Sequence, residues 1–534
     1  MSSEKKYKTG SSNIILSDYP DPDVIRLDDT YYMVSTTMHF MPGCVILRSY
    51  NLLDWEFCSY VYDDLDKTPR QQLLDNKGVY GKGMWAASLR HHKGLFYISF
   101  VANDTGKSYL FTSADIKGPW KKSEIAGFYH DMSILFDDDE NDGRVFIVHG
   151  NTEIHLTEMK SDLSGPKPDG IDKIIIEDDR EKVNLGYEGS HFYKIKNKYY
   201  IFLIHMPKDK MRTEACFVAD KIDGPYKGCD VLHSDLGNWK SGLAQGGIVQ
   251  ANDGKWYSIV FQDHGALGRI PILVPVTFKD DFPVFGETDS TGQQIAPQSV
   301  KVLDNNPDYK YAPLYTSDFT DKKGKLHPLW QWNHTHNPEL AKIENNTLEI
   351  KTDKIVKNPV QAANTLTQRT FTEQCLGSVT LDASKINEGD YAGLCALEGE
   401  YAFIALTKKD GKYFLVTADH TNKYSPWTMN VYNDDFPAFH EEIPLEKLGL
   451  DLTASDNNKA IITLQLKFSL HYKDEKVQLM YLNPKTGNFE QVGKASQLRY
   501  TLDQFVGVRF AMFMYSTKTP GGIAKFSDFK YDFW

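Results

Sequence analysis

Asp21 is the acidic residue whose neighbours in the sequence most restrict the orientation of its side chain. It lies between two prolines in the run Tyr-Pro-Asp-Pro-Asp of residues 19–23, ahead of the strand-like residues 24–27. Each proline fixes its own φ angle and favours an extended conformation in the residue before it, so we expect Asp21 to be stiffly held and extended. Such a carboxyl group suits acid–base chemistry, in which direction matters. The alternative is an ordinary turn, because Asp and Pro are common turn residues.

Two further acids have comparable surroundings. Asp131 opens the apolar run 132–136, and Glu188 lies among the glycines of residues 186–189, which allow close approach of a ligand. Glycosidases cut with two carboxyl groups, one acting as acid and the other as base or nucleophile. A third acid nearby raises the pKa of the proton donor, since like charges disfavour ionisation. The three acids could do this chemistry if the fold brought them to one axis.

A repeated unit in the first half indicates the elements that position these acids. A turn residue, a polar residue and then aromatic and β-branched residues recur in five units, which begin at residues 29, 94, 143, 197 and 254. The spacings of 65, 49, 54 and 57 residues are typical of propeller blades, which are usually four-stranded sheets. We therefore predict a five-bladed β-propeller over about residues 14–305. The alternative is a β-sandwich whose Tyr-rich strands are evenly spaced by coincidence.

The second half has a different pattern. Residues 304–308 (Asp-Asn-Asn-Pro-Asp) have the composition of a linker and end the periodic region. Beyond about residue 320, polar and apolar residues alternate in runs such as 347–351, 460–466 and 505–510. Such alternation is typical of an antiparallel β-sandwich. The sequence thus predicts two all-β domains, a propeller over residues 1–310 and a sandwich over residues 320–534.

The composition argues against several classes of partner. The 534 residues, 41% of them hydrophobic and 25% charged, predict a soluble globular protein of two or three domains. A net charge of −12 and a pI near 5.8 argue against nucleic acid or an anionic membrane as a partner. No apolar run has the length needed to span a bilayer.

Cysteine usage and the first residues bear on the compartment. The six cysteines are scattered and form no Cys-x-x-Cys pair, so we predict free, mostly buried thiols. The first thirty residues lack the apolar core of a secretion signal, which predicts a cytoplasmic protein. A chain whose signal had been removed would look the same and would be secreted or periplasmic.

The motifs around the three acids closely resemble those of glycoside hydrolase family 43. The resemblance begins with residues 19–23 and 31–37, and continues in order through residues 83–87, the His130-Asp131 strand and residues 188–194. In the second half, residues 330–334 and 527–531 resemble the C-terminal sandwich of the β-xylosidase and α-L-arabinofuranosidase branch. The resemblance covers nearly the whole chain. It implies a five-bladed propeller followed by a concanavalin-like jelly roll.

The resemblance also implies an inverting mechanism. Asp21 would be the general base that activates water, and Glu188 the general acid that protonates the leaving oxygen. Asp131 would orient this acid and tune its pKa. The base and the acid of inverting enzymes stand about 6.5–9.5 Å apart, which leaves room for the water. Asp23 is disfavoured as the base, because the family's Asp lies between the two prolines.

A pocket for a terminal sugar follows from the same resemblance. Met38 and Trp85 occupy positions at which the family places apolar walls, and Arg269 matches an arginine that binds substrate hydroxyls. His264 lies just before this arginine, and Gln245 stands where many relatives carry a His on the propeller axis, so both are candidate substrate-binding residues. The alternative for Met38 and Trp85 is core packing, and for Arg269 a surface ion pair.

We predict no metal site and no required cofactor. Relatives often carry calcium or another cation near the axial His, but Gln245 is a poorer metal ligand, which disfavours a structural calcium. The acidic run 137–143 lacks the Glu that closes a calcium loop, so we expect a solvated hairpin tip there.

These features together predict an exo-glycosidase that removes terminal β-D-xylosyl residues from short xylo-oligosaccharides, as in xylan degradation. One alternative is an α-L-arabinofuranosidase, alone or combined with xylosidase activity. A family 32 fructosidase is disfavoured because its motifs are absent, and a non-catalytic sugar-binding propeller is disfavoured because all three acids are present. We expect the sandwich to cap the pocket, and a small oligosaccharide to be the partner. The sequence leaves open whether the chain forms a homo-oligomer.

Overall fold

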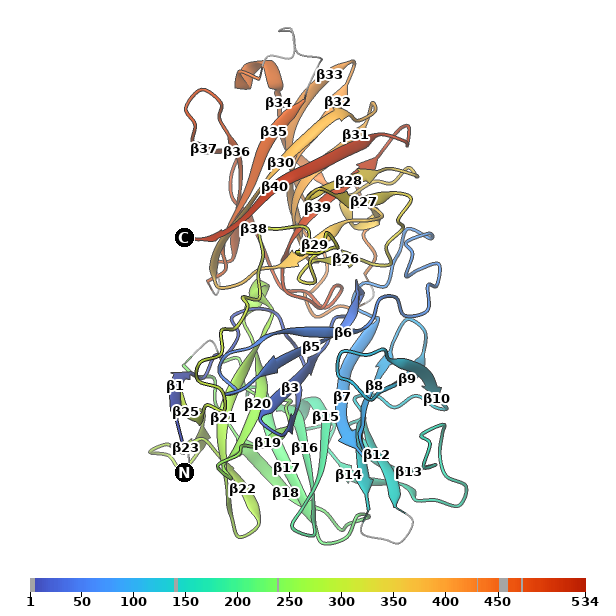
Figure 1. Cartoon of the computed structure of the whole chain (residues 1–534), viewed down its shortest axis with the longest axis vertical. Coiled ribbons are helices and arrows are strands. Elements are labelled where there is room, and N and C mark those ends of the chain that lie inside the picture. Colours follow the sequence, from blue (N-terminus) through green and yellow to red (C-terminus); the bar gives the residue numbers. More distant parts are fainter. Residues whose placement is uncertain (1–4, 139–142, 238–239, 430, 451–459, 472–473) are drawn as a thin grey trace.

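The computed structural model describes residues 5–138, 143–237, 240–429, 431–450, 460–471 and 474–534 (Figure 1). Within these ranges the regular elements are β-strands and three short 3₁₀ helices. The first half of the chain forms the lower, blue-to-green body in Figure 1, and most of the second half forms the upper, yellow-to-red body. The predicted all-β class is confirmed.

Five four-stranded antiparallel sheets form the blades of a propeller. The first two blades are β2 (Asp23–Leu27), β3 (Thr30–Ser35), β5 (Gly43–Ser49) and β6 (Glu56–Tyr62), then β7 (Met84–His92), β8 (Leu95–Ala102), β9 (Lys107–Ser113) and β10 (Lys121–Ile125). The third and fourth are β11 (Ser133–Asp137), β12 (Arg144–Asn151), β13 (Glu153–Met159) and β14 (Asp172–Glu177), then β15 (Val183–Ile195), β16 (Lys198–Pro207), β17 (Thr213–Ala219) and β18 (Lys227–Leu232). The fifth is β19 (Ile248–Gln250), β20 (Trp256–Asp263), β21 (Arg269–Lys279) and β22 (Phe282–Phe285). The first strands contact one another, as β2 does with β7 and β19, and so surround the axis.

The repeated unit of the sequence is the second strand of each blade. β3, β8, β12, β16 and β20 each begin within two residues of a predicted start. Their aromatic and β-branched residues pack between blades, as Ile98 and Phe100 of β8 do in one buried cluster with Ile46 of β5. Both faces of a blade are covered, which explains why these strands are apolar on both sides. The prediction of a five-bladed propeller is confirmed.

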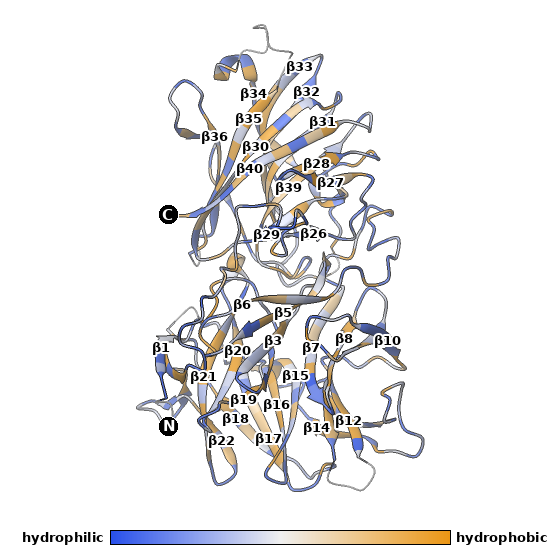
Figure 2. Ribbon diagram, in the orientation of Figure 1, coloured by the Kyte–Doolittle hydropathy of each residue, from blue (hydrophilic) through white to orange (hydrophobic). Residues whose placement is uncertain are grey.

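Two large antiparallel sheets form the second half. The first runs in the order β34-β33-β32-β31-β39-β29-β26-β4, and the second in the order β27-β28-β40-β30-β35-β36-β37, with β38 paired to β36. Figure 2 shows hydrophobic colour along the strands and hydrophilic colour on many loops, in agreement with one core between the sheets. The strands of the first sheet are β34 (Ala438–Pro444), β33 (Lys412–Asp419), β32 (Ala402–Lys409), β31 (Asp390–Leu397), β39 (Arg509–Ser516), β29 (Leu366–Arg369), β26 (Gln331–Asn333) and β4 (Phe40–Met41). Those of the second are β27 (Ala341–Glu344), β28 (Thr347–Lys351), β40 (Ile523–Phe533), β30 (Gln374–Lys385), β35 (Ile461–Ser469), β36 (Lys476–Leu482), β37 (Phe489–Gln491) and β38 (Ser496–Gln497).

The remaining elements are small. β1 (Tyr7–Ser11) pairs with β25 (Ser299–Leu303), and β23 (Glu287–Thr288) pairs with β24 (Gln294–Ile295). The 3₁₀ helices are η1 (Gly265–Leu267), η2 (Pro359–Gln361) and η3 (Leu445–Leu448). Among the described residues, no helix combines the length and apolar character that crossing a membrane requires. All six cysteines are free, as predicted.

The two halves share backbone and side-chain contacts. β4 comes from the N-terminal part of the chain, yet Met41 lies opposite Trp332 of β26, so a propeller segment forms the edge of a sandwich sheet. The buried Asp18 accepts hydrogen bonds from the backbone N–H groups of Arg269 (2.9 Å) and Gly507 (3.0 Å). The sandwich loop 499–508 is thereby fixed to the fifth blade.

One predicted strand, residues 505–510, is wrong over its first four residues. β39 begins only at Arg509, and Phe505 has a φ of 60°, outside the extended region. The N–H groups of Gly507 and Val508 donate to Asp18 and to the carbonyl of Ala266, so their partners lie in the propeller rather than in a sheet. The predicted hairpin tip at residues 137–143 falls largely outside the described residues, because these exclude 139–142.

Candidate active site

A pocket at the propeller axis draws residues from all five blades and from the sandwich. Six of the eight predicted site residues line it, and Phe505 reaches it from the sandwich loop. The lining residues are Asp21, Trp85, Ala86, His130, Asp131, Leu185, Glu188, Ile204, Arg212, Gln245, Phe261, Arg269 and Phe505.

Three pocket residues share an uncommon backbone conformation. Asp21, Asp131 and Gln245 precede the first strands of blades one, three and five, and their φ angles are 52°, 48° and 58°. Few residues other than glycine adopt this left-handed region, and Asp is among those that tolerate it. The expected extended conformation of Asp21 is therefore wrong: the tolerance of Asp for this region outweighs the preference imposed by Pro22. The expectation that Asp131 opens its strand as Asp21 does agrees with the structure.

The Asp21 carboxyl group is held at both oxygens. Thr36 donates its hydroxyl to Oδ2 at 2.7 Å, and Arg269 Nη1 donates to Oδ1 at 2.8 Å. The Arg269 guanidinium lies 4.4 Å from the ring centroid of Phe261 and 4.5 Å from that of Phe505. Arg269 thus fixes one carboxylate while its own position is fixed by an aromatic ring from each domain.

Asp131 and Glu188 both approach one ring nitrogen of His130. The imidazole Nε2 is 3.4 Å from Glu188 Oε2 and 3.6 Å from Asp131 Oδ2. The charge of Asp131, with a smaller contribution from Glu188, raises the pKa of His130 to about 9. Burial raises the pKa of Asp131 to about 6, against the opposing effect of His130. Asp131 Oδ2 also accepts from the N–H of Gly189 at 3.2 Å, which fixes the backbone beside Glu188.

Glu188 is the most accessible of the three carboxyl groups, with 19% of its side chain exposed. Asn151 donates its side-chain amide to Glu188 Oε2. The carboxyl group is therefore oriented by neutral and cationic donors while it remains open to the pocket.

Two predicted site residues do not line the pocket. Met38 is buried, packs against Phe40 and Val506, and lies in the same cluster as Trp85 and Phe505. Met38 supports the pocket wall from behind. This is the core packing that was the alternative to contact with the sugar. His264 is buried beside Gln262, with its Nε2 2.8 Å from Gln262 Oε1, and burial lowers the pKa of His264 to about 4.

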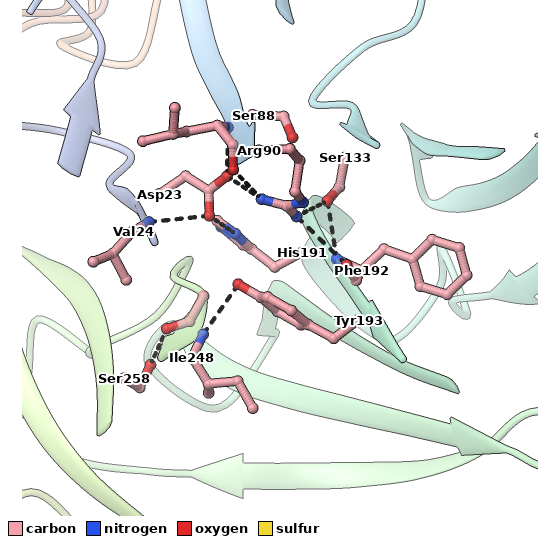
Figure 3. A network of polar contacts seen from close by, with 12 residues as sticks. Asp23, Val24, Ser88, Arg90, Ser133, His191, Phe192, Tyr193, Ile248 and Ser258 are labelled. Atoms are coloured by element: carbon pink, nitrogen blue, oxygen red, sulfur yellow. Dashed lines mark hydrogen bonds and ion pairs between the residues drawn. The ribbon is translucent and has the colours of Figure 1, made fainter. Parts of the chain in front are cut away.

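Asp23 belongs to a separate polar network on the axis (Figure 3). Its Oδ2 accepts from Arg90 Nη1 at 2.7 Å, and its Oδ1 is 3.1 Å from His191 Nδ1. Arg90 continues the network to the hydroxyl of Ser133 at 2.6 Å, and its guanidinium lies 5.3 Å from the ring centroid of Tyr193. Although burial alone would raise it, the charges of Arg90 and His191 bring the pKa of Asp23 down to about 2. With 1% of its side chain exposed, Asp23 is enclosed, in agreement with the preference for Asp21 as the base.

Sequence reasoning missed seven pocket residues, four of which carry an aromatic or charged side chain: His130, Arg212, Phe261 and Phe505. The His130-Asp131 pair was a usable signal, because a basic residue next to a candidate catalytic acid affects the pKa of that acid. Arg212 forms an ion pair with Asp263, which also accepts from Arg269 Nε at 3.2 Å. No local pattern marked Phe505 as a pocket residue, since the alternation of residues 505–510 predicts a strand.

The pocket contains one group of side chains that could hold a cation. Ligand atoms of His130, Asp131 and Glu188 all lie within 4.8 Å of one another, a grouping found once among the described residues. Asn151, His130 and Gly189 already provide partners for these carboxyl oxygens. The absence of a metal from the site stays a prediction.

A five-bladed propeller whose axial carboxyl groups are covered by a β-sandwich defines the class of this protein. Residues 11–283 match the glycosyl hydrolases family 43, and residues 316–532 match the beta xylosidase C-terminal concanavalin A-like domain. The chain belongs to glycosyl hydrolase family 43, and the predicted concanavalin-like sandwich is confirmed.

Curated relatives and solved structures agree with this membership. The beta-xylosidase of Formosa agariphila is 29% identical over 381 residues, which cover 65% of this chain and 62% of the relative. The non-reducing end alpha-L-arabinofuranosidase of Bacteroides ovatus is 27% identical over 302 residues, or 52% of this chain and 54% of the relative. A solved bifunctional GH43-CE protein of Bacteroides eggerthii is 36% identical with a TM-score of 0.86, and the match covers 99% of this chain and 64% of that chain. The chain thus spans less than two thirds of the length of these relatives.

Proposed function

We propose that this chain is an inverting exo-glycosidase that removes terminal β-D-xylosyl residues from the non-reducing end of xylo-oligosaccharides. The observation that carries the proposal is the meeting of Asp21, Asp131 and Glu188, from three blades, in one pocket. Two of them have partners suited to different roles: Asp21 is bound by a cation, and Glu188 is open and oriented by donors.

In the proposed reaction, Asp21 accepts a proton from water as the water oxygen bonds to the anomeric carbon. Glu188 donates its proton to the leaving oxygen as the bond from that carbon to this oxygen breaks. The anomeric configuration inverts, because attack and departure occur on opposite faces. Asp131 orients Glu188 through the N–H of Gly189. Arg269 keeps Asp21 aligned through the ion pair between its Nη1 and Asp21 Oδ1.

The closed wall at Phe505 supports cleavage of a terminal unit rather than mid-chain cleavage. Phe505 packs 5.5 Å from the ring centroid of Trp85, and Asp18 fixes its loop to the fifth blade. A pocket with such a wall admits the end of a chain. Rapid mid-chain cutting of xylan, seen as an early fall in viscosity, would contradict this proposal.

α-L-Arabinofuranosidase activity is the second candidate. A relative from Butyrivibrio fibrisolvens, 27% identical over 299 residues, is named xylosidase/arabinosidase. Xylose and arabinofuranose present similar hydroxyls, so one pocket with Arg269 and Gln245 as polar contacts suits both sugars.

Proton NMR of the sugar released from aryl β-D-xylopyranoside and aryl α-L-arabinofuranoside tests the proposal. We expect the inverted anomer to appear first, and Glu188→Gln to lower kcat by about 10²–10⁴-fold. Asp289, a half-buried acid outside the pocket, provides the control Asp289→Asn, which should match the unmodified enzyme. Turnover of neither substrate, or release of the retained anomer, would contradict the proposal.

We further propose that catalysis requires no cofactor. Dialysis against a chelator should leave the rate unchanged. A loss of activity that calcium restores would contradict this, and would make His130, Asp131 and Glu188 the candidate ligands among the described residues.

A further inference from the structure

The loop 420–437, between β33 and β34, carries a concentration of exposed aromatic side chains. Trp427 is 68% exposed, Phe436 61% and Tyr424 58%. Elsewhere in the described part of the chain, exposed large apolar side chains are dispersed over many elements. We call the described residues of this segment, 420–429 and 431–437, the aromatic loop. Exposed Trp and Tyr side chains in one segment mark an interaction surface more often than isolated ones do.

The aromatic loop lies next to the loop that closes the pocket. The Pro426 carbonyl, immediately before Trp427, accepts a hydrogen bond from the Leu502 N–H at 2.8 Å. Phe505, which lines the pocket, lies three residues beyond Leu502. Three extended residues span at most about 11 Å, so Trp427 is within a few sugar lengths of the pocket wall.

The aromatic loop is anchored at several points, while the side chains of Tyr424 and Trp427 are exposed. Asn422 donates its side-chain amide to Asp503 at 3.2 Å, and its own Oδ1 accepts from the Tyr424 N–H at 2.9 Å. On the propeller side, Arg70 donates to the hydroxyl of Tyr432 at 3.1 Å. Anchored aromatic side chains lose little conformational entropy when they bind a ligand.

We propose that Tyr424 and Trp427 bind the leaving-group side of the substrate, the sugar units of a β-1,4-linked xylose chain beyond the bond that is cut. This inference rests on the proposed function. Flat aromatic rings offer an apolar face to the C–H surface of a pyranose ring, and the exposed side chain of Lys423 lies beside them for its hydroxyls. A neutral chain needs no cationic patch, so the acidic character of the protein does not oppose it.

A second copy of the chain fits this surface less well. Two aromatic side chains bury about 300–500 Å², whereas a stable interface needs about 800 Å² from each partner. Copies that each carry a net charge of −12 also repel one another. A sugar chain requires only the rings and a few hydrogen-bonding groups.

Substrate length provides the test. We expect Trp427→Ala and Tyr424→Ala to lower kcat/KM for xylotetraose and xylohexaose by about fivefold to twentyfold through KM. Their values for aryl β-D-xylopyranoside should be unchanged, since this substrate has no sugar unit beyond the bond that is cut. Trp427→Phe, which keeps a flat ring, should retain most of the dependence of kcat/KM on substrate length, and Trp427→Leu should lose it. Tyr7→Ala removes an exposed aromatic side chain on β1 and is the matched control.

Equal effects at every substrate length, or no effect at any, would overturn the inference. A change in oligomeric state by light scattering, specific to Trp427→Ala, would instead assign the aromatic loop to contact between copies and also overturn it. Failure of the proposed function is distinguished by absent turnover of both aryl glycosides. In that case, the tryptophan fluorescence of the protein should still change on titration with xylohexaose. If the same change occurred in Trp427→Ala, the proposed binding of sugar to the aromatic loop would be refuted.

Discussion

The pocket and the axial network of Asp23 are both buried polar clusters drawn from several blades, but they balance charge differently. In the axial network one carboxylate meets Arg90 and His191, and the pKa of Asp23 falls to about 2. In the pocket three carboxyl groups share Arg269 and His130, and burial raises the pKa of Asp131 to about 6. Matched charges favour a fixed structure, whereas an excess of one charge leaves a group ready to exchange protons.

The largest expected effect is the loss of activity in Asp21→Asn. The amide cannot accept a proton from water, so kcat on the aryl xyloside should fall by about 10²–10⁴-fold. Thermal unfolding should shift far less than in the corresponding axial variant, because Arg269 keeps Asp263 as a partner. Retained activity would show that the base lies elsewhere. The pocket and the axial network would then not differ in catalytic role.

The axial variant Asp23→Asn should act on stability. It leaves the Arg90 guanidinium buried without its carboxylate, which costs about 3–5 kcal/mol for an ion pair of this kind. Urea unfolding measures this loss. Asp138→Asn, in the exposed pair with Lys93, is the control and should change stability much less. A small effect for Asp23→Asn would mean that the network is not structural.

The two clusters should respond to pH with opposite signs. The pKa of Asp131 is raised in the folded state, so its contribution to the free energy of unfolding falls as pH rises from about 4 through about 6, by on the order of 3 kcal/mol. The pKa of Asp23 is lowered, so its stabilisation is present above about 4 and lost as pH falls through about 2.

Unfolding measured between pH 2 and 7 separates these contributions. Asp131→Asn should remove the decline in the free energy of unfolding between pH 4 and 6. Asp23→Asn should make that free energy less dependent on pH below pH 4. In the unmodified protein His130 does not interfere between pH 4 and 6, because its folded pKa of about 9 and its unfolded pKa of about 6.5 both keep it protonated there. Unchanged curves would refute the assigned charge balance.

The smallest effect is expected from Met38→Leu. Met38 lies outside both clusters and packs behind the pocket wall, so a swap of similar volume should cost less than about 1.5 kcal/mol. KM for the aryl xyloside should change less than threefold. A large rise in KM would restore Met38 to the sugar-binding residues.

The sequence carries much of this architecture because much of it is locally encoded. The second strand of each blade repeats a turn and an apolar strand, so five units were visible without contacts. Asp21, Asp131 and Glu188 were identifiable from neighbouring Pro, Gly and apolar residues. The charge balance around Asp23 was not, because Arg90 and His191 reach it from two other blades.

Contacts between the two halves were the least predictable part. Phe505 lies in a run whose alternation favours a strand, but Asp18 and Ala266 of the propeller take the hydrogen bonds of the following residues. β4 is too short to be recognised, and its partner β26 follows nearly the whole propeller. Such features depend on tertiary partners that no local pattern specifies.

The pairing of β4 with β26 has a consequence for synthesis on the ribosome. Phe40 and Met41 are made early, but their strand partners are Asn333 and Trp332. Until those residues have emerged, a nascent propeller carries an open strand edge beside an unfinished pocket wall. Open edges recruit other chains. Completion of the sandwich therefore protects the propeller during its own biogenesis.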